Sequence, residues 1–122
     1  MSRYVLTIDR WTPATVNELI DAHWRRASQL KRIDRNMIAG YVALNRIPPA
    51  TGKRRVELTI TRGESDPGRP VDPDNWFKSL LDALVRARML IDDSAEWCEH
   101  RFIGTERGDR KATRIELIDL EE

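Results

Sequence analysis

Residues 69–94, with the sequence RPVDPDNWFKSLLDALVRARMLIDDS, decide the fold of this chain and carry most of its candidate chemistry. The segment opens on Asp72 and Asp74, which one proline separates, and it closes on a second pair, Asp92 and Asp93. Between the pairs, apolar residues recur at helical spacing: Phe77, Leu80, Leu81, Leu84 and Val85. This pattern predicts an amphipathic helix from about residue 74 to 88, with carboxylates at both ends.

The charged residues of this segment have a purely structural interpretation. Asp72 or Asp74 can cap the helix, because an aspartate side chain accepts hydrogen bonds from the first backbone N–H groups of a helix. Asp92 and Asp93 are also typical of a turn before a strand. On the outer face of the helix, charged residues follow at intervals of four and favour ordinary salt bridges: Asp74, Lys78, Asp82 and Arg86.

A functional interpretation starts from the cost of placing carboxylates side by side. Asp72, Asp74 and Asn75 bring several oxygen ligands into one turn of chain, and like charges this close repel unless a cation or a proton intervenes. Mg²⁺ takes oxygen ligands and is usually held by one or two carboxylates together with substrate phosphates. Lys78 lies one helical turn beyond Asp74, where it can contact a phosphate oxygen. These residues therefore also predict metal-dependent phosphate chemistry.

The spacing of these motifs resembles that of the RusA-type Holliday-junction resolvases. The resemblance is close over residues 72–93 and elsewhere covers only the order of elements. The shared pattern is Asp72-x-Asp74-Asn75, Lys78, Asp82-Ala83-Leu84 and Asp92-Asp93. The chain departs from the family at Arg88, because relatives often carry a glycine shortly before the closing pair, and a glycine there would end the helix.

The resemblance assigns roles to individual residues. It implies that Asp72, Asp74 and Asp93 are Mg²⁺-binding catalytic carboxylates, with Mn²⁺ as a substitute, and that catalysis also needs Lys78. The other two polar motif residues, Asn75 and Asp92, are expected to lie around these ligands.

The family's activity sets the functional expectation. The resemblance implies a Mg²⁺-dependent endodeoxyribonuclease that resolves Holliday junctions or related branched DNA by paired phosphodiester hydrolysis, in DNA recombination and repair. The alternatives are a junction-binding protein without catalysis and a structural domain in which Asp-x-Asp is only a cap. A sugar-nucleotide transferase is disfavoured because the chain is short and has no glycine-rich phosphate loop, so no nucleotide cofactor is expected. Relatives in the family are often encoded by prophages.

The composition favours one domain. The 122 residues are enough for a core. The chain lacks both the roughly 18 to 20 apolar residues of a membrane span and the apolar core of a signal peptide, so we expect a soluble, cytoplasmic protein. Cys98 is the lone cysteine, which excludes an intrachain disulfide and a cysteine zinc cluster. His23 and His100 are expected to be structural or incidental.

The charges are segregated although they nearly cancel, with 21 lysines and arginines against 20 aspartates and glutamates. A metal-dependent nuclease needs such segregation, with an acidic centre for the cation and basic flanks for phosphates. The residues expected to contact DNA are Arg25, Arg26, Lys31, Arg32, Arg35, Lys53, Arg54, Arg55 and Arg69. Residues 53–55 should lie exposed at a loop tip, and a solvated face is the alternative for residues 25–35. Trp11 and Trp24 are expected to pack in the fold rather than to stack on bases.

The remaining patterns predict an α/β fold. Alternation predicts strands at residues 3–9 and around residues 56–60, and strands are also expected at about 95–103 and 112–120. The capping box Thr15-x-x-Glu18 opens a helix expected to extend to about residue 44. The order β-α-β-α-β-β gives a single domain, residues 1–122, with one mixed β-sheet packed by two helices.

The spacing of the two aspartate pairs predicts an assembly. Fifteen helical residues from 74 to 88 span about 22 Å, and the five residues up to Asp93 return at most roughly 17 Å. Asp93 therefore reaches Asp72 and Asp74 of its own chain only under strain, unless the helix ends early or bends. We expect a homodimer in which Asp93 of one subunit completes, or lies near, the site of the other. A two-fold dimer also suits paired cuts in a four-way junction.

Overall fold

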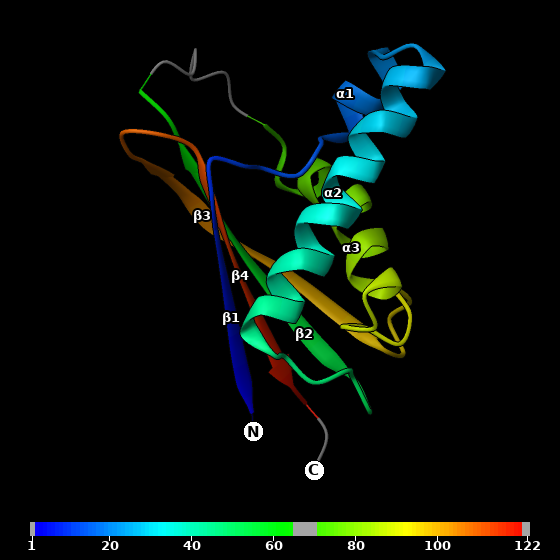
Figure 1. Ribbon diagram of the computed structural model, residues 1–122. Helices are drawn as coiled ribbons and strands as arrows, with labels where there is room; N and C mark the ends of the chain where they lie inside the picture. Colours follow the sequence, from blue (N-terminus) through cyan, green and yellow to red (C-terminus); the bar gives the residue numbers. More distant parts are fainter. Residues whose placement is uncertain (1, 65–70, 121–122) are drawn as a thin grey trace.

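The chain folds into one mixed four-stranded sheet with its helices on one face (Figure 1). The computed structural model describes residues 2–64 and 71–120. In chain order, the elements are β1 (Arg3–Asp9), α1 (Val16–Asp21), α2 (Trp24–Asn45), β2 (Arg54–Arg62), the 3₁₀ turn η1 (Pro73–Trp76), α3 (Phe77–Arg86), β3 (Cys98–Arg107) and β4 (Ala112–Asp119). The predicted α/β class and the order of strands and helices are confirmed. Within the described residues, no helix has both the length and the apolar character needed to cross a membrane.

The order of strands across the sheet is β1-β4-β2-β3. β4 runs antiparallel to both β1 and β2, whereas β2 and β3 are parallel. Two parallel neighbours need a crossover connection, and here η1 and α3 provide it. Because β2 and β3 run in the same direction, the end of β2 and the start of β3 lie at opposite ends of the sheet (Figure 1). This topology decides how far apart the two aspartate pairs lie.

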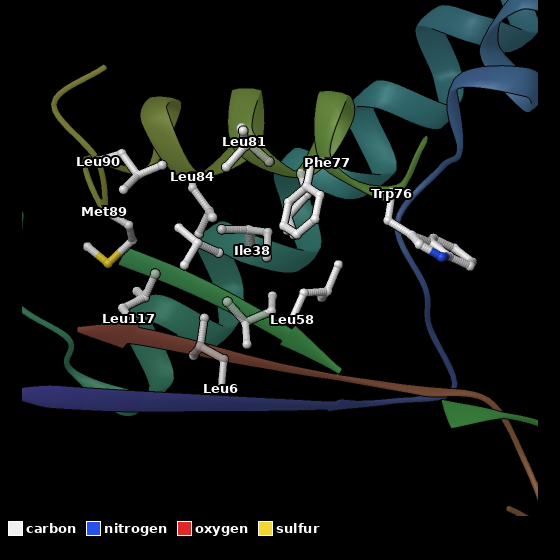
Figure 2. Close-up of a cluster of buried hydrophobic side chains, with 14 of the residues drawn as sticks. Leu6, Ile38, Leu58, Trp76, Phe77, Leu81, Leu84, Met89, Leu90 and Leu117 are labelled. Atoms are coloured by element: carbon white, nitrogen blue, oxygen red, sulfur yellow. The ribbon is translucent and has the colours of Figure 1, made fainter. Parts of the chain in front are cut away.

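The core lies between the sheet and the two long helices, and Figure 2 shows its centre. Alternate strand residues such as Leu6, Leu58 and Leu117 point towards Ile38 of α2 and the apolar face of α3. Full burial of such a side chain stabilises the fold by about 1.5–3 kcal/mol. The predicted buried face of the second helix is confirmed for Phe77, Leu80, Leu81 and Leu84, whereas Val85 is only partly buried.

The prediction of one long helix from residue 15 to 44 is wrong, because this segment forms two helices, α1 and α2. The capping box is present: the Glu18 N–H donates to Thr15 Oγ1 at 3.2 Å and the Thr15 N–H to Glu18 Oε1 at 3.0 Å. The backbone then leaves the helix at Ala22, which is extended, and His23 caps α2 by accepting the Arg25 N–H on Nδ1 at 3.3 Å. A side chain that can cap a new helix competes with continuation of the old one. His23 is therefore structural, as expected.

Arg88 follows α3 at the position where the RusA-type pattern commonly has a glycine, and the helix ends there. Its φ of 65° lies in the left-handed region. The Arg88 N–H donates to the Val85 carbonyl at 3.0 Å and the Met89 N–H to the Leu84 carbonyl at 2.9 Å. This is the hydrogen-bond pattern of a Schellman motif, whose left-handed residue is usually glycine. The helix therefore ends where a glycine would end it, at the energetic cost of a strained arginine.

Candidate functional site

Asp72 and Asp74 lie at the start of η1 with their side chains exposed. Asp72 caps the turn: Oδ1 accepts the Asp74 N–H at 3.2 Å, and its carbonyl accepts the Asn75 N–H at 2.9 Å. The capping interpretation thus describes how Asp72 is oriented. A cap uses one carboxylate oxygen and leaves the other open. Neither carboxylate forms an ion pair with any residue that the structure describes.

The donor set at η1 suits a hard cation. Asp72 and Asp74 offer oxygen ligands within three residues of chain, with half-buried Asn75 beside them. Mg²⁺ is usually held by one or two carboxylates and completes its coordination with water and substrate phosphates, so the residue types of this pair fit that cation. Across residues 2–64 and 71–120, however, no three histidine, cysteine, aspartate or glutamate side chains gather closely enough to hold a metal.

Asp93 lies at the other end of the crossover. It follows α3 and precedes β3. Burial raises the pKa of the Cys98 thiol to about 11, and the negative charge of Asp93 adds to that rise. Cys98, the first residue of β3, pairs with Arg54 at the start of β2. Asp72 instead follows the end of β2 along the chain. The four residues of η1 and ten of α3 together span about 23 Å. Asp93 and its exposed neighbour Asp92 are therefore not brought to Asp72 and Asp74 within one chain.

A basic groove lies between α2 and α3, next to η1. It encloses about 110 Å³ and is lined by Lys31, Arg35, Lys78, Ser79 and Asp82. Asp82 Oδ2 is 3.0 Å from Arg35 Nε of α2 and 3.5 Å from Arg86 Nε. Of the expected ladder along the helix, only the Asp82–Arg86 pair forms among the described residues. Lys31 and Lys78 form no ion pair with a described residue. The groove therefore keeps an excess of positive charge one helical turn from Asp74, which suits a phosphate group.

Asp34 is a buried residue whose role the sequence did not reveal. Its side chain is 2% exposed and accepts three hydrogen bonds. The donors are Trp11 Nε1 at 3.1 Å, the Ala14 N–H at 2.9 Å and Ser79 Oγ at 2.7 Å. Burial raises the pKa of Asp34, and the three hydrogen bonds oppose that rise. Asp34 ties the loop after β1 and both long helices together beneath the groove. Its position four residues from both Leu30 and Ile38, on the apolar face of the helix, is a sequence signal of burial that its charge within a basic run obscured.

The predicted DNA-contacting residues lie in different environments. Arg25, Arg26 and Arg32 are exposed along α2, and Arg35 and Lys31 line the groove. Lys53 is half-buried, and Arg55 forms ion pairs with Glu57 and Glu99. Arg69 lies outside the described residues.

Arg54 corrects the expectation that residues 53–55 form an exposed tip. It is 2% exposed, and its guanidinium donates to Asp119 Oδ1 at 2.7 Å, the Met89 carbonyl at 3.1 Å and the Pro48 carbonyl at 3.0 Å. The guanidinium carbon also lies 5.2 Å from the centre of the Tyr4 ring. Alternation along β2 turns this side chain towards the helices, so it joins strand ends and loops instead of meeting DNA.

The aromatic residues follow the packing expectation only in part. Trp11 is 6% exposed and bonded to Asp34, so it packs as expected. His100 packs on Phe77, with ring centres 4.5 Å apart, as a structural histidine. Trp24 is 66% exposed, so the expectation that it packs in the fold is wrong.

No protein-family model matches the chain, and neither does any curated protein.

Proposed function

We propose that this chain is a Mg²⁺-dependent endodeoxyribonuclease of the RusA type that cuts branched DNA in the cytoplasm, in DNA recombination and repair. The observation that carries the proposal is the pair of exposed, unpaired carboxylates Asp72 and Asp74 beside a groove with two uncompensated lysines. A carboxylate pair alone fits a helix cap, and a lysine alone fits a solvated surface. Their proximity supplies both a cation site and a phosphate site.

Each residue of the site has a separate task in phosphodiester hydrolysis. Asp72 and Asp74 would hold the metal, with Asp93 as a third carboxylate. Bound Mg²⁺, or Mn²⁺, supplies charge neutralisation at the phosphate and a lower pKa for the attacking water. Lys78 stabilises the negative charge that develops on the phosphoryl oxygens or the leaving group. Lys31 and Arg35 position the neighbouring phosphates, which fixes register without selecting sequence.

A homodimer accounts for the distance between the aspartate pairs. β3 is an outer strand of the sheet, and Asp93 precedes its start. A two-fold axis perpendicular to β3 that sets two β3 strands side by side makes them antiparallel, so the start of each strand meets the end of its partner. Asp93 of one subunit then lies at the end of the sheet where the partner carries Asp72 and Asp74. A two-fold pair of such sites suits paired cuts in a four-way junction.

The proposal is tested by incubating a labelled synthetic four-way junction, and linear duplex of the same sequence, with the protein in Mg²⁺ and in EDTA. The parent should nick the junction in pairs of symmetric positions, in Mg²⁺ only. Asp74→Asn should abolish nicking without unfolding the protein, because Asp72 caps η1 and the exposed Asp74 side chain forms no ion pair with a described residue. Asp109→Asn, an exposed aspartate outside the motif, is the matched control. Binding of the junction without cutting in any metal would replace the proposal with a catalytically silent junction-binding protein.

A further inference from the structure

The corner between α1 and α2 exposes two large apolar side chains that the proposed chemistry does not use. Trp24, the first residue of α2, is 66% exposed, and Ile20 of α1 is 72% exposed. The guanidinium carbon of Arg25 lies 5.1 Å from the centre of the Trp24 ring. The corner projects from the end of the helical layer, at the top right of Figure 1. A tryptophan left in water beside an arginine at such a corner indicates a contact surface, because its large apolar ring would otherwise favour burial.

This corner lies at the same end of the molecule as the carboxylate pair. Asp34 bonds to Ser79 and Arg35 to Asp82, so α2 and α3 run side by side in the same direction. Trp24 precedes Lys31 by seven residues, or about 10 Å of helix, and Asp74 precedes Lys78 by four. Both therefore lie past the same end of the basic groove, and α1 contacts η1 directly.

We propose that the Trp24 ring is a stacking platform for an unstacked nucleobase at the branch point of the DNA. The inference rests on the proposed function and adds a recognition element to it. Every base presents a π-face to an aromatic ring, and the exposed arginines at positions 25, 26 and 32 supply positive charge for the adjoining phosphates. A linear duplex keeps its bases stacked, so this contact favours branched DNA.

The test compares Trp24→Ala and Trp24→Phe with the parent, using a four-way junction and the linear duplex of the same sequence, in EDTA so that binding is measured without cutting. The junction carries 2-aminopurine at the branch point, whose fluorescence rises when it leaves its neighbours in the base stack and changes again when it stacks on a ring. Leu44→Ala is the matched control, since Leu44 is 76% exposed near the opposite end of α2. Thermal melts verify that each variant folds, which the exposure of both residues favours.

Trp24→Ala should weaken junction binding about tenfold, the usual scale for one base–aromatic stack, and leave duplex binding unchanged. Trp24→Phe should keep most of the affinity, and Leu44→Ala should behave as the parent. Equal junction affinity for Trp24→Ala and the parent, or an equal loss on junction and duplex, would overturn the stacking platform while leaving the nuclease proposal intact. A parent protein that does not prefer the junction to the duplex would instead overturn the proposed function itself.

Discussion

Replacement of Arg54 by alanine should destabilise the fold strongly, although a basic run in the sequence placed this residue among the DNA contacts. The guanidinium is 2% exposed and makes three hydrogen bonds, to one carboxylate and two carbonyls. Hydrogen bonds to a charged group contribute about 1.5–3 kcal/mol each. Asp119 is 31% exposed and Pro48 is an exposed residue, so water replaces part of what is lost there. The Met89 carbonyl belongs to a residue that is 1% exposed and would lose its partner.

From these contributions, Arg54→Ala should lower the free energy of unfolding by about 3–5 kcal/mol, the range for removing one partner of a buried charged pair. With a slope of about 2 kcal/mol per molar urea, the midpoint of unfolding should fall by about 1.5–2.5 M. Arg54→Lys should lower the free energy of unfolding less, because an ammonium group keeps the charge. Some loss should remain, because that group cannot reach all three acceptors. Arg55→Ala, at the neighbouring arginine, should lower the free energy of unfolding by less than about 1 kcal/mol, because Arg55 is 27% exposed and its ion-pair contacts to Glu57 and Glu99 are long, at 3.7 Å and 3.4 Å.

The assay is urea unfolding followed by tryptophan fluorescence and circular dichroism, together with DNA binding at a temperature where each variant is folded. If Arg54→Ala lowers the free energy of unfolding by less than about 1 kcal/mol but weakens DNA binding selectively, the assignment of Arg54 as a buried structural residue is wrong and the side chain reaches the DNA. If it unfolds as calculated and the folded fraction binds DNA normally, the structural role stands.

Three further predictions concern single residues. Arg88→Gly should raise the free energy of unfolding by about 0.5–1 kcal/mol in thermal melts, because glycine removes the left-handed strain at φ 65° but costs some chain entropy; an unchanged or lower stability would contradict the strain. Burial raises the pKa of Asp34 above 3.8, so the folded state holds this proton more tightly than the unfolded chain, and the contribution of Asp34 to stability should decline as pH rises from about 4 to the raised pKa. Asp34→Asn should remove that decline when urea titrations measure the free energy of unfolding across this pH window. The substitution should also lower that free energy by about 1–3 kcal/mol, because it leaves a buried hydrogen-bond donor unsatisfied. Parallel pH profiles of stability for the parent and the variant would refute the assignment. With a pKa of about 11, the buried Cys98 thiol should react with a disulfide reagent at pH 8 roughly 100-fold more slowly in the folded protein than in urea, and equal rates would show that the thiol is accessible.

Three strands, β1, β2 and β4, and the helix α3 were predictable because their hydrophobic periodicity agrees with their environment. The strand expected at about residues 95–103 lies instead at Cys98–Arg107, and its residues are mostly exposed, so no periodicity fixed its bounds. Residues 56, 58 and 60 alternate in the sequence and are fully buried in β2, and the apolar spacing of α3 matches its buried face. Such patterns follow from local geometry alone, with a period of 2 for strands and 3.6 for helices. The distance argument from helix length needed only the rise per residue, and the shared site across a dimer that it suggests stays a prediction.

The errors came from features that depend on contacts distant in sequence. Arg54 is buried because the start of β2 meets the end of β4 and two loops, and no local pattern distinguishes it from Lys53 and Arg55. Asp34 is satisfied by donors 23 and 45 residues away. The break at Ala22 had a weak local signal in the capping capacity of His23, which the apolar spacing across the two helices obscured.

The most direct measurement mixes two inactive variants, Asp74→Asn and Asp93→Asn, and follows nicking of a four-way junction in Mg²⁺. If each metal site takes Asp72 and Asp74 from one subunit and Asp93 from the other, each mixed dimer contains one intact site and one that lacks both carboxylates. Random exchange makes half of the dimers mixed, so about a quarter of the sites should recover, and the cuts should fall on one strand at a time. The account predicts nicking by the mixture and none by either variant alone. An inactive mixture, with demonstrated subunit exchange and an active parent, would contradict the shared site.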